Sequence, residues 1–222
     1  MSLTAGAAAA LLGAAAGPAG SVALRRLRSP QPAIQAEYFA LAQSRRAQGC
    51  RSVVGAVVCA AIGLRLGWTA TLPVWAVIGG VGTLLGAVDW RTRQLPGAIV
   101  NPCLLFSAAL IIAISAGTAD WASLLFAAGG WAVAGGLFGL IWLVSPRGLG
   151  YGDVRLAALL AMCLGWCDAT ALLPALFLTL VLAAGAGLLL RLGRWLHRGQ
   201  PIPLGPFLIA GAVTAVLLRQ SA

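Results

Sequence analysis

Eight apolar stretches, separated by short polar segments, make up most of the chain. They cover Ser2–Leu24, Ser52–Gly67, Thr71–Val88, Ala98–Gly117, Trp121–Val144, Val154–Trp166, Ala169–Leu190 and Pro203–Leu218. A helix needs about 20 apolar residues to cross the hydrocarbon core of a bilayer. The sixth and eighth stretches are shorter, which indicates local thinning of the bilayer or polar flanks that line a cavity. The pattern predicts an all-α polytopic membrane protein with about eight transmembrane helices.

Composition agrees with this pattern. The hydrophobic residues amount to 60% of the 222 positions and the charged residues to only 9%, whereas a soluble domain has about 25% charged residues. Eight spans leave little chain for a soluble unit, so we expect residues 1–222 to form a single membrane-embedded domain. Glycines spaced as Gly82 and Gly86 are typical of close packing between membrane helices.

The charge is strongly basic and unevenly distributed. All 15 basic residues are arginines, they face only five acids, and the net charge is +10. Six arginines lie in residues 25–51, a polar loop with a proline pair and a possible short amphipathic helix around Ala36–Ala47. The positive-inside rule places this loop in the cytoplasm, and alternation of the spans then leaves only Arg65 and Arg219 outside. We therefore expect a multi-pass plasma-membrane protein whose arginines contact lipid head groups and which has no nucleic-acid partner.

Cysteine and histidine offer no evident metal site. The five cysteines form no C-x-x-C pair, and His197 is the only histidine. Cys163 and Cys167 share a helix face, but zinc sites usually combine four such ligands. We expect no metal and no cofactor.

The five acids divide into two groups. Asp120 and Asp168 come just before predicted helices on the outer side, where aspartate is a good N-cap, and Glu37 lies among arginines that can pair with it. Asp89 ends the third span and Asp153 opens the sixth, so the topology places both at the cytoplasmic edge of the bilayer.

Two carboxylates brought together in a partly dry site cannot both ionise at neutral pH. The pair then holds one proton, and it offers a base that activates water and an acid that protonates a peptide group. Gly148, Gly150 and Gly152 permit unusual backbone angles and close approach of another chain segment before Asp153. The residues alone also allow a simpler interpretation, in which this Gly-x-Gly-Asp segment is a turn with a helix cap.

Four segments give the chain a specific resemblance. Gly150–Leu156 resembles the second aspartate motif of type IV prepilin leader peptidases, a family of Gly-x-Gly-Asp intramembrane aspartyl proteases. Asp89–Pro96 resembles the first aspartate motif, Ile202–Phe207 a Pro-Phe-Gly-Pro stretch, and Gly20-Ser21 the end of the first helix. The resemblance covers about residues 50–215.

This resemblance implies a function and a set of site residues. The catalytic pair would be Asp89 and Asp153, and the supporting residues would be Gly150, Gly152, Pro96, Pro203, Gly205 and Pro206. The substrates would be type IV prepilins or pseudopilins, cut after a glycine between the short basic leader and the hydrophobic helix, at the cytoplasmic membrane face. The competing interpretation is a small secondary transporter or proton-conducting subunit, which would place ionisable residues near the bilayer midplane.

The chain departs from the family pattern at three places. Gly97 stands where the family usually has Asp or Asn, and Arg155 stands where it usually has lysine. Bifunctional members carry an insert with two C-x-x-C pairs between the first two helices, associated with N-methylation, whereas residues 25–51 contain only Cys50. The resemblance therefore implies a short form that cleaves without methylating.

Overall fold

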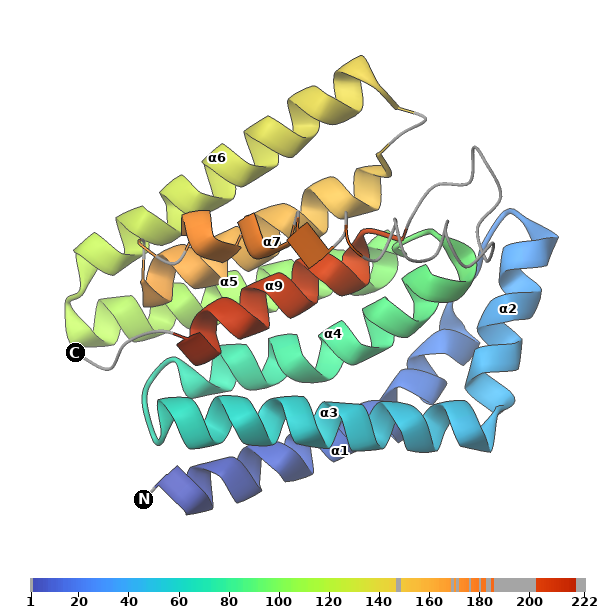
Figure 1. The fold of residues 1–222 in the computed structure, drawn as a ribbon, viewed down its shortest axis with the longest axis horizontal. Helices are drawn as coiled ribbons and strands as arrows, with labels where there is room; N and C mark the ends of the chain where they lie inside the picture. The colour runs from blue at the N-terminus through green and yellow to red at the C-terminus, as the bar shows by residue number, and fades with distance from the viewer. Residues whose placement is uncertain are drawn as a thin grey trace.

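The computed structural model is a bundle of helices that run alternately in opposite directions (Figure 1). It describes residues 2–146, 149–168, 170, 172–175, 177–179, 181–182, 185 and 203–218, and these contain no β-strand. The principal helices are α1 (Ser2–Arg26), α2 (Pro32–Gln43), α3 (Arg45–Leu66), α4 (Leu72–Thr92), α5 (Gly97–Thr118), α6 (Trp121–Val144), α7 (Tyr151–Cys167) and α9 (Gly205–Leu218).

Five of these helices, α1, α3, α4, α5 and α6, are long and apolar enough to cross a membrane. This confirms the prediction of an all-α polytopic membrane protein. The shorter sixth and eighth stretches correspond to α7, with 17 residues, and α9, with 14. The seventh stretch, Ala169–Leu190, falls largely outside the described residues, so the count of eight spans stays a prediction.

The predicted loop 25–51 is mostly helical, which corrects its description as a loop. The amphipathic helix exists, as α2, but it starts at Pro32, and α3 already starts at Arg45. Proline suits the first turn of a helix, and the Ser44 side chain caps α3 by accepting a hydrogen bond from the Ala47 N–H at 3.2 Å. Arginine is a good helix former, so the basic residues extend α3 beyond its apolar part.

Arg51 lies inside the protein, although its place in the predicted loop suggested contact with lipid. It is 3% exposed, and its guanidinium donates to Ser21 Oγ at 2.7 Å and to the Leu41 carbonyl at 3.3 Å. These two bonds join α3 to α1 and to the end of α2. Glu37, on α2, forms an ion pair with Arg91 in the last turn of α4 at 3.7 Å, and because both side chains are exposed this pair contributes little stability.

Hydrogen bonds between helix ends define two opposite ends of the bundle. The Arg65 Nε donates to the Leu217 carbonyl at 3.0 Å, and the Trp166 indole donates to Ser115 Oγ at 3.0 Å. The last turns of α3, α5, α7 and α9 therefore lie at one end, on the left of Figure 1. The other end holds the C-termini of α1 and α4, the N-termini of α7 and α9, and α2, and we call it the basic end because nine of the ten described arginines lie there.

Small residues let the helices approach closely. A side chain at Gly13 of α1 would overlap the backbone of Gly55 on α3, so these two helices touch along their main chains. The expectation for Gly82 and Gly86 is also met, since a Cβ at Gly82 would lie 2.9 Å from Ile209 of α9. Glycine spacing thus fixes which helices are neighbours.

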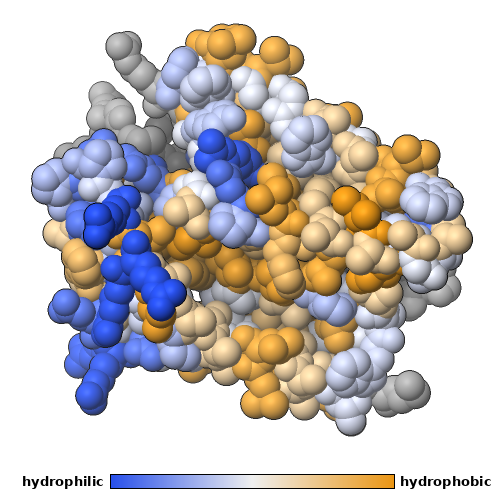
Figure 2. All heavy atoms as spheres, turned by 180° about the vertical axis from the view of Figure 1, so that it is seen from behind, coloured by the Kyte–Doolittle hydropathy of each residue, from blue (hydrophilic) through white to orange (hydrophobic). Residues whose placement is uncertain are grey.

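The outer surface is apolar over a broad area. In Figure 2 the most hydrophilic residues gather in the left half of the view, and hydrophobic residues cover much of the remainder. Leu105 on α5 and Leu125, Leu143 and Val144 on α6 are each more than two-thirds exposed. Such exposure is unfavourable in water and suits a surface that faces lipid.

Candidate active site

Asp89 lies in the last turn of α4, buried at the basic end. It is 3% exposed, and its Oδ2 accepts a hydrogen bond from the Gly205 N–H at 2.9 Å. Gly205 is the first residue of α9, so the carboxylate lies at a helix N-terminus, where free N–H groups and the helix dipole favour a negative charge. This donor compensates part of the cost of burying the carboxylate.

The segment before and into α9 is shaped to fit this aspartate. A Cβ at Gly205 would lie 2.9 Å from Asp89 Oδ2 and 3.3 Å from its Cγ, so the position has no room for a side chain. Pro203 is buried just before the helix. Pro206, in the first helical turn where proline fits well, lies 3.9 Å from a Cβ built at Gly86, one turn before Asp89.

Asp153 occupies the first turn of α7, as expected. Its Oδ2 accepts from the Gly150 N–H at 3.2 Å, and its own N–H donates to the Gly150 carbonyl at 3.0 Å. Gly150 is the residue that caps α7. This arrangement fixes the carboxyl group at the start of the helix. Gly148, the third glycine of the predicted segment, lies outside the described residues.

The two aspartates, far apart in sequence, form one electrostatic site. Asp89 lies in the last turn of α4 and Asp153 in the first turn of α7, both at the basic end, where like charges on the two carboxyl groups would repel each other. Asp153 Oδ1 is buried and has no hydrogen-bond partner among the described residues. A buried carboxyl oxygen without a partner is costly, and such an atom often marks the place of a catalytic proton, a water or a substrate.

A close backbone contact brings the two motifs together. α4 ends at Arg93, which adopts a left-handed conformation with φ of 51° and donates its N–H to the Asp89 carbonyl at 2.8 Å. The chain then runs through Leu95 to Pro96, which caps α5. A Cβ at Gly152 would lie 2.6 Å from the Leu95 Cβ and 2.9 Å from its carbonyl oxygen. Glycine at 152 therefore lets the start of α7 lie directly on the segment that follows Asp89.

The structure adds an aromatic and basic cluster that the motifs did not indicate. The Arg155 guanidinium lies 4.4 Å above the Tyr151 ring, whose centre is 5.1 Å from that of Trp142. The same guanidinium occupies the space next to Gly97, where a Cβ would overlap it. The two departures from the family pattern, Gly97 and Arg155, are therefore neighbours in space. The sequence contained one signal for this contact, because both positions differ from the family pattern in the same chain.

The remaining aspartates lie at the opposite end of the bundle. Asp120 caps α6 by accepting from the Ser123 N–H at 3.1 Å, and hydrogen bonds from the side chain and backbone of Ser123 hold the pKa of Asp120 below its usual value. Asp168 ends α7 and accepts from the Thr170 N–H at 2.9 Å. Both belong to turns.

The described part of the chain contains no group of three histidine, cysteine, aspartate or glutamate side chains that could hold a metal ion. His197 lies outside it. The expectation of a site without metal or cofactor stays a prediction.

Comparison with known proteins identifies the class to which this membrane bundle belongs. The model of the type IV leader peptidase family matches residues 76–192, over half of the chain and including both aspartates. The protein therefore belongs to the type IV leader peptidase family. No solved structure matches the chain significantly.

Curated relatives carry the name prepilin leader peptidase/N-methyltransferase. One from Burkholderia pseudomallei (strain 1026b) is 33% identical over 138 residues, which are 60% of this chain and 42% of that protein. One from Aeromonas hydrophila is 29% identical over 195 residues, which are 79% of this chain and 63% of that protein. The relative from Aeromonas salmonicida (strain A449) has the same identity and coverage. The chain thus spans less than two-thirds of the length of these relatives.

The geometry predicts that Gly152→Ala and Gly205→Ala each reduce the activity of the candidate site about 100-fold, since misplacing a reacting group by about 1 Å costs this much. The first change pushes α7 from Leu95, and the second pushes α9 from Asp89. The matched control is Gly139→Ala on α6, whose Cβ would make an ordinary 3.9 Å contact with Val154. Cleavage is scored on gels at equal membrane expression. Wild-type rates in either site variant would contradict the assigned contacts.

Proposed function

We propose that the protein is an aspartic endopeptidase that removes the leader peptide from type IV prepilins or prepilin-like pseudopilins. The observation that carries this proposal is the pair Asp89 and Asp153, held on separate helices within electrostatic range of each other. The family membership and the names of the relatives support the same substrate class.

The chemistry follows from one proton shared by two carboxyl groups. The ionised carboxylate takes a proton from a water molecule as that water attacks the scissile carbonyl carbon. The protonated carboxyl group gives its proton to the carbonyl oxygen, and proton return to the peptide nitrogen then releases the new amino terminus. Asp153 Oδ1, with no partner among the described residues, is the oxygen best placed to bind the water or the peptide.

The site is proposed to lie at the cytoplasmic face of a bacterial plasma membrane. Both aspartates are at the basic end, and arginine-rich segments remain on the cytoplasmic side of membrane proteins. At this depth the junction between a basic leader and a hydrophobic helix is accessible from the cytoplasm. The exposed arginines would bind anionic lipid head groups.

The distribution of acids favours a peptidase over the competing transporter or proton-conducting subunit. Each described acid lies at an end of the bundle or on α2, and none lies in the middle of a described span. A transporter would be expected to place ionisable groups near the bilayer midplane.

Substitution of the two aspartates tests the catalytic pair. Asp89→Asn and Asp153→Asn should each lower leader removal by about 10³-fold or more, because asparagine keeps the size of aspartate but neither takes nor gives the proton. The double variant should be no worse than either single variant, since the pair acts as one unit.

Asp120→Asn and Asp168→Asn are the controls for this test. Both remove a carboxylate from the opposite end of the bundle, and the asparagine side-chain oxygen can still accept the hydrogen bond from the Ser123 or the Thr170 N–H group. They should cleave at near-normal rates. Substantial cleavage by either Asp89→Asn or Asp153→Asn at matched expression would end the aspartic-peptidase proposal.

Thiol labelling tests the proposed orientation. In a cysteine-free background, a cysteine at Gly97 should resist an impermeant reagent added to intact cells, and one at Gly117 should react. These glycines lie at opposite ends of α5, and no atom outside the backbone neighbourhood is within 4 Å of a Cβ at Gly117. If the impermeant reagent labelled a cysteine at position 97 in intact cells, the two aspartates would lie on the outer face of the membrane, where they could not reach a cytoplasmic leader.

We propose that the protein cleaves its substrates but does not N-methylate them, although the relatives are named for both activities. The segment between α1 and α3 forms only α2 and two short connections and contains no cysteine, since Cys50 lies near the start of α3. Mass spectrometry of a mature pilin processed by this protein alone should therefore give an unmodified amino terminus. A methyl group that disappears when the protein is deleted would contradict this prediction.

A further inference from the structure

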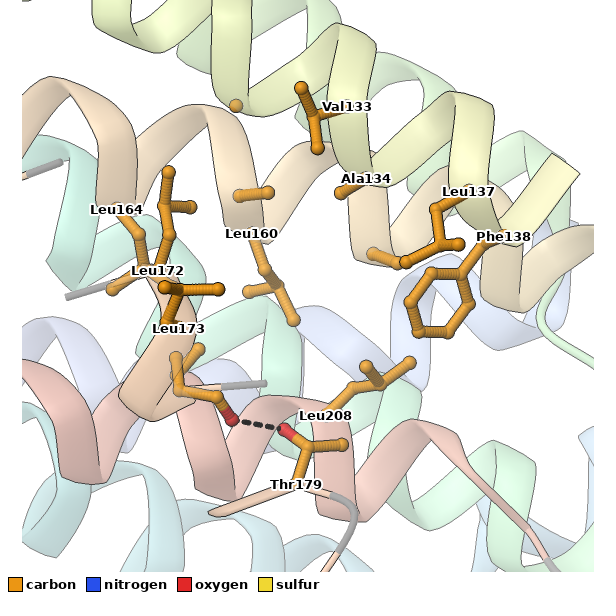
Figure 3. Close-up of a pocket in the computed structure, with 15 residues that line it drawn as sticks. Val133, Ala134, Leu137, Phe138, Leu160, Leu164, Leu172, Leu173, Thr179 and Leu208 are labelled. Atoms are coloured by element: carbon orange, nitrogen blue, oxygen red, sulfur yellow. Dashed lines mark hydrogen bonds between the residues drawn. The ribbon is translucent and has the colours of Figure 1, made fainter. Parts of the chain in front are cut away.

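An apolar cavity of about 110 Å³ lies between α6, α7, α9 and the helical residues 172–175 and 177–179 (Figure 3). Phe138 and Leu208 approach each other at one end of it, and Ala134 and Leu160 face it from α6 and α7. The labelled polar side chain, Thr179, donates its hydroxyl proton to the Ala175 carbonyl at 2.8 Å. Since the walls offer water few hydrogen bonds, the cavity suits an apolar group.

The cavity is in helical register with the two aspartates. On α7 the lining residues Ala157 and Leu160 follow Asp153 at spacings of four and seven, so they lie on the same helix face. On α9 the lining residue Leu208 follows Gly205, the residue in contact with Asp89, at a spacing of three. The cavity therefore lies along the same face of α7 and of α9 that carries the candidate active site.

We infer that this cavity is the subsite for one apolar side chain of the substrate on the mature side of the cut. This inference rests on the proposed function. From the aspartates the cavity extends away from the basic end, which is the direction that the hydrophobic helix of an inserted prepilin takes into the bilayer. The leader, on the other side of the scissile bond, remains at the basic end.

The size of the cavity and its distance from Asp153 limit which substrate residue can occupy it. A cavity of about 150 Å³ holds a benzene molecule, so one of about 110 Å³ holds a single aliphatic side chain and not a helix. Ala157 lies about 6 Å along α7 from Asp153, at 1.5 Å per residue. The same distance corresponds to about two residues of extended substrate or four of helical substrate. The side chain in the cavity therefore belongs to the second, third or fourth residue after the cut.

The test fills the cavity from a wall that is remote from the aspartates. Ala134→Leu on α6 adds bulk to the cavity, and Ala132→Leu, two positions away at an exposed place that does not line it, is the matched control. The substrates are one prepilin and a set of its variants in which each of the first six mature residues is replaced singly by alanine.

With the natural substrate, Ala134→Leu should lower kcat/KM about 10-fold or more, the usual effect of a small volume change in a hydrophobic pocket. Ala132→Leu should cleave like wild type. One alanine substrate, at the second to fourth position, should be a poor substrate for wild type and should lose nothing further with Ala134→Leu. Phe138→Ala, which enlarges the cavity, should accept a larger side chain at that same position.

Three results would overturn the inference while wild-type cleavage still upholds the proposed function. One is equal rates for Ala134→Leu and Ala132→Leu, as expected if a lipid chain fills the cavity. Another is a uniform loss with all substrates, which would indicate damage to the fold. The third is that the cleavage rates of the six alanine substrates depend on the position of the alanine in the same way for wild type, Ala134→Leu and Phe138→Ala. Absence of cleavage by wild type would instead contradict the proposed function.

Discussion

The hydrogen bond from the Gly205 N–H to the buried carboxylate of Asp89 is the interaction on which the rest of the site depends. A carboxylate inside an apolar bundle is costly unless a donor meets it. Here the donor is the N-terminus of α9, which also supplies a favourable dipole. This requirement explains why position 205 has no side chain and why proline and glycine face each other where α9 crosses α4.

A second close contact, between Gly152 and Leu95, positions the other acid, Asp153. Gly152 lets α7 start directly on the Leu95 backbone, so Asp153 is positioned by a main-chain contact and not by a flexible side chain. Both carboxyl groups are thus held at the ends of helices, a placement that suits the catalytic role that we propose for them. Beside this contact, Gly97 has no side chain, and the guanidinium of Arg155 occupies the space that a side chain at position 97 would need.

In the function that we propose, the apolar part of the bundle has a role besides spanning the membrane. α7 and α9 carry the site at one end and the walls of a cavity one turn further along the same faces. A peptidase that cuts where a polar leader meets a hydrophobic helix needs two environments. One holds charge and water at the scissile bond, and the other is apolar and holds the first side chains of the hydrophobic helix. The helices α7 and α9 would provide both, because the candidate site and the cavity lie along the same helix faces.

The sequence by itself determined the helical class and the approximate positions of most described helices, and it singled out the residues of the candidate site, because apolar periodicity, arginine asymmetry and the glycine–aspartate motifs are local signals. It also predicted correctly that Asp120 caps a helix and that Asp153 lies in the first turn of one. It predicted a short helix within residues 25–51 but started it at Ala36 instead of Pro32, and it missed that α3 already starts at Arg45, because the Ser44 cap and the buried contacts of Arg51 with α1 and α2 are not part of the apolar pattern. Only the tertiary structure decided that Gly205 supplies the donor to Asp89, that Gly152 touches Leu95 and that Arg155 covers Gly97. Those contacts join residues far apart in the chain, and their geometry depends on how whole helices pack.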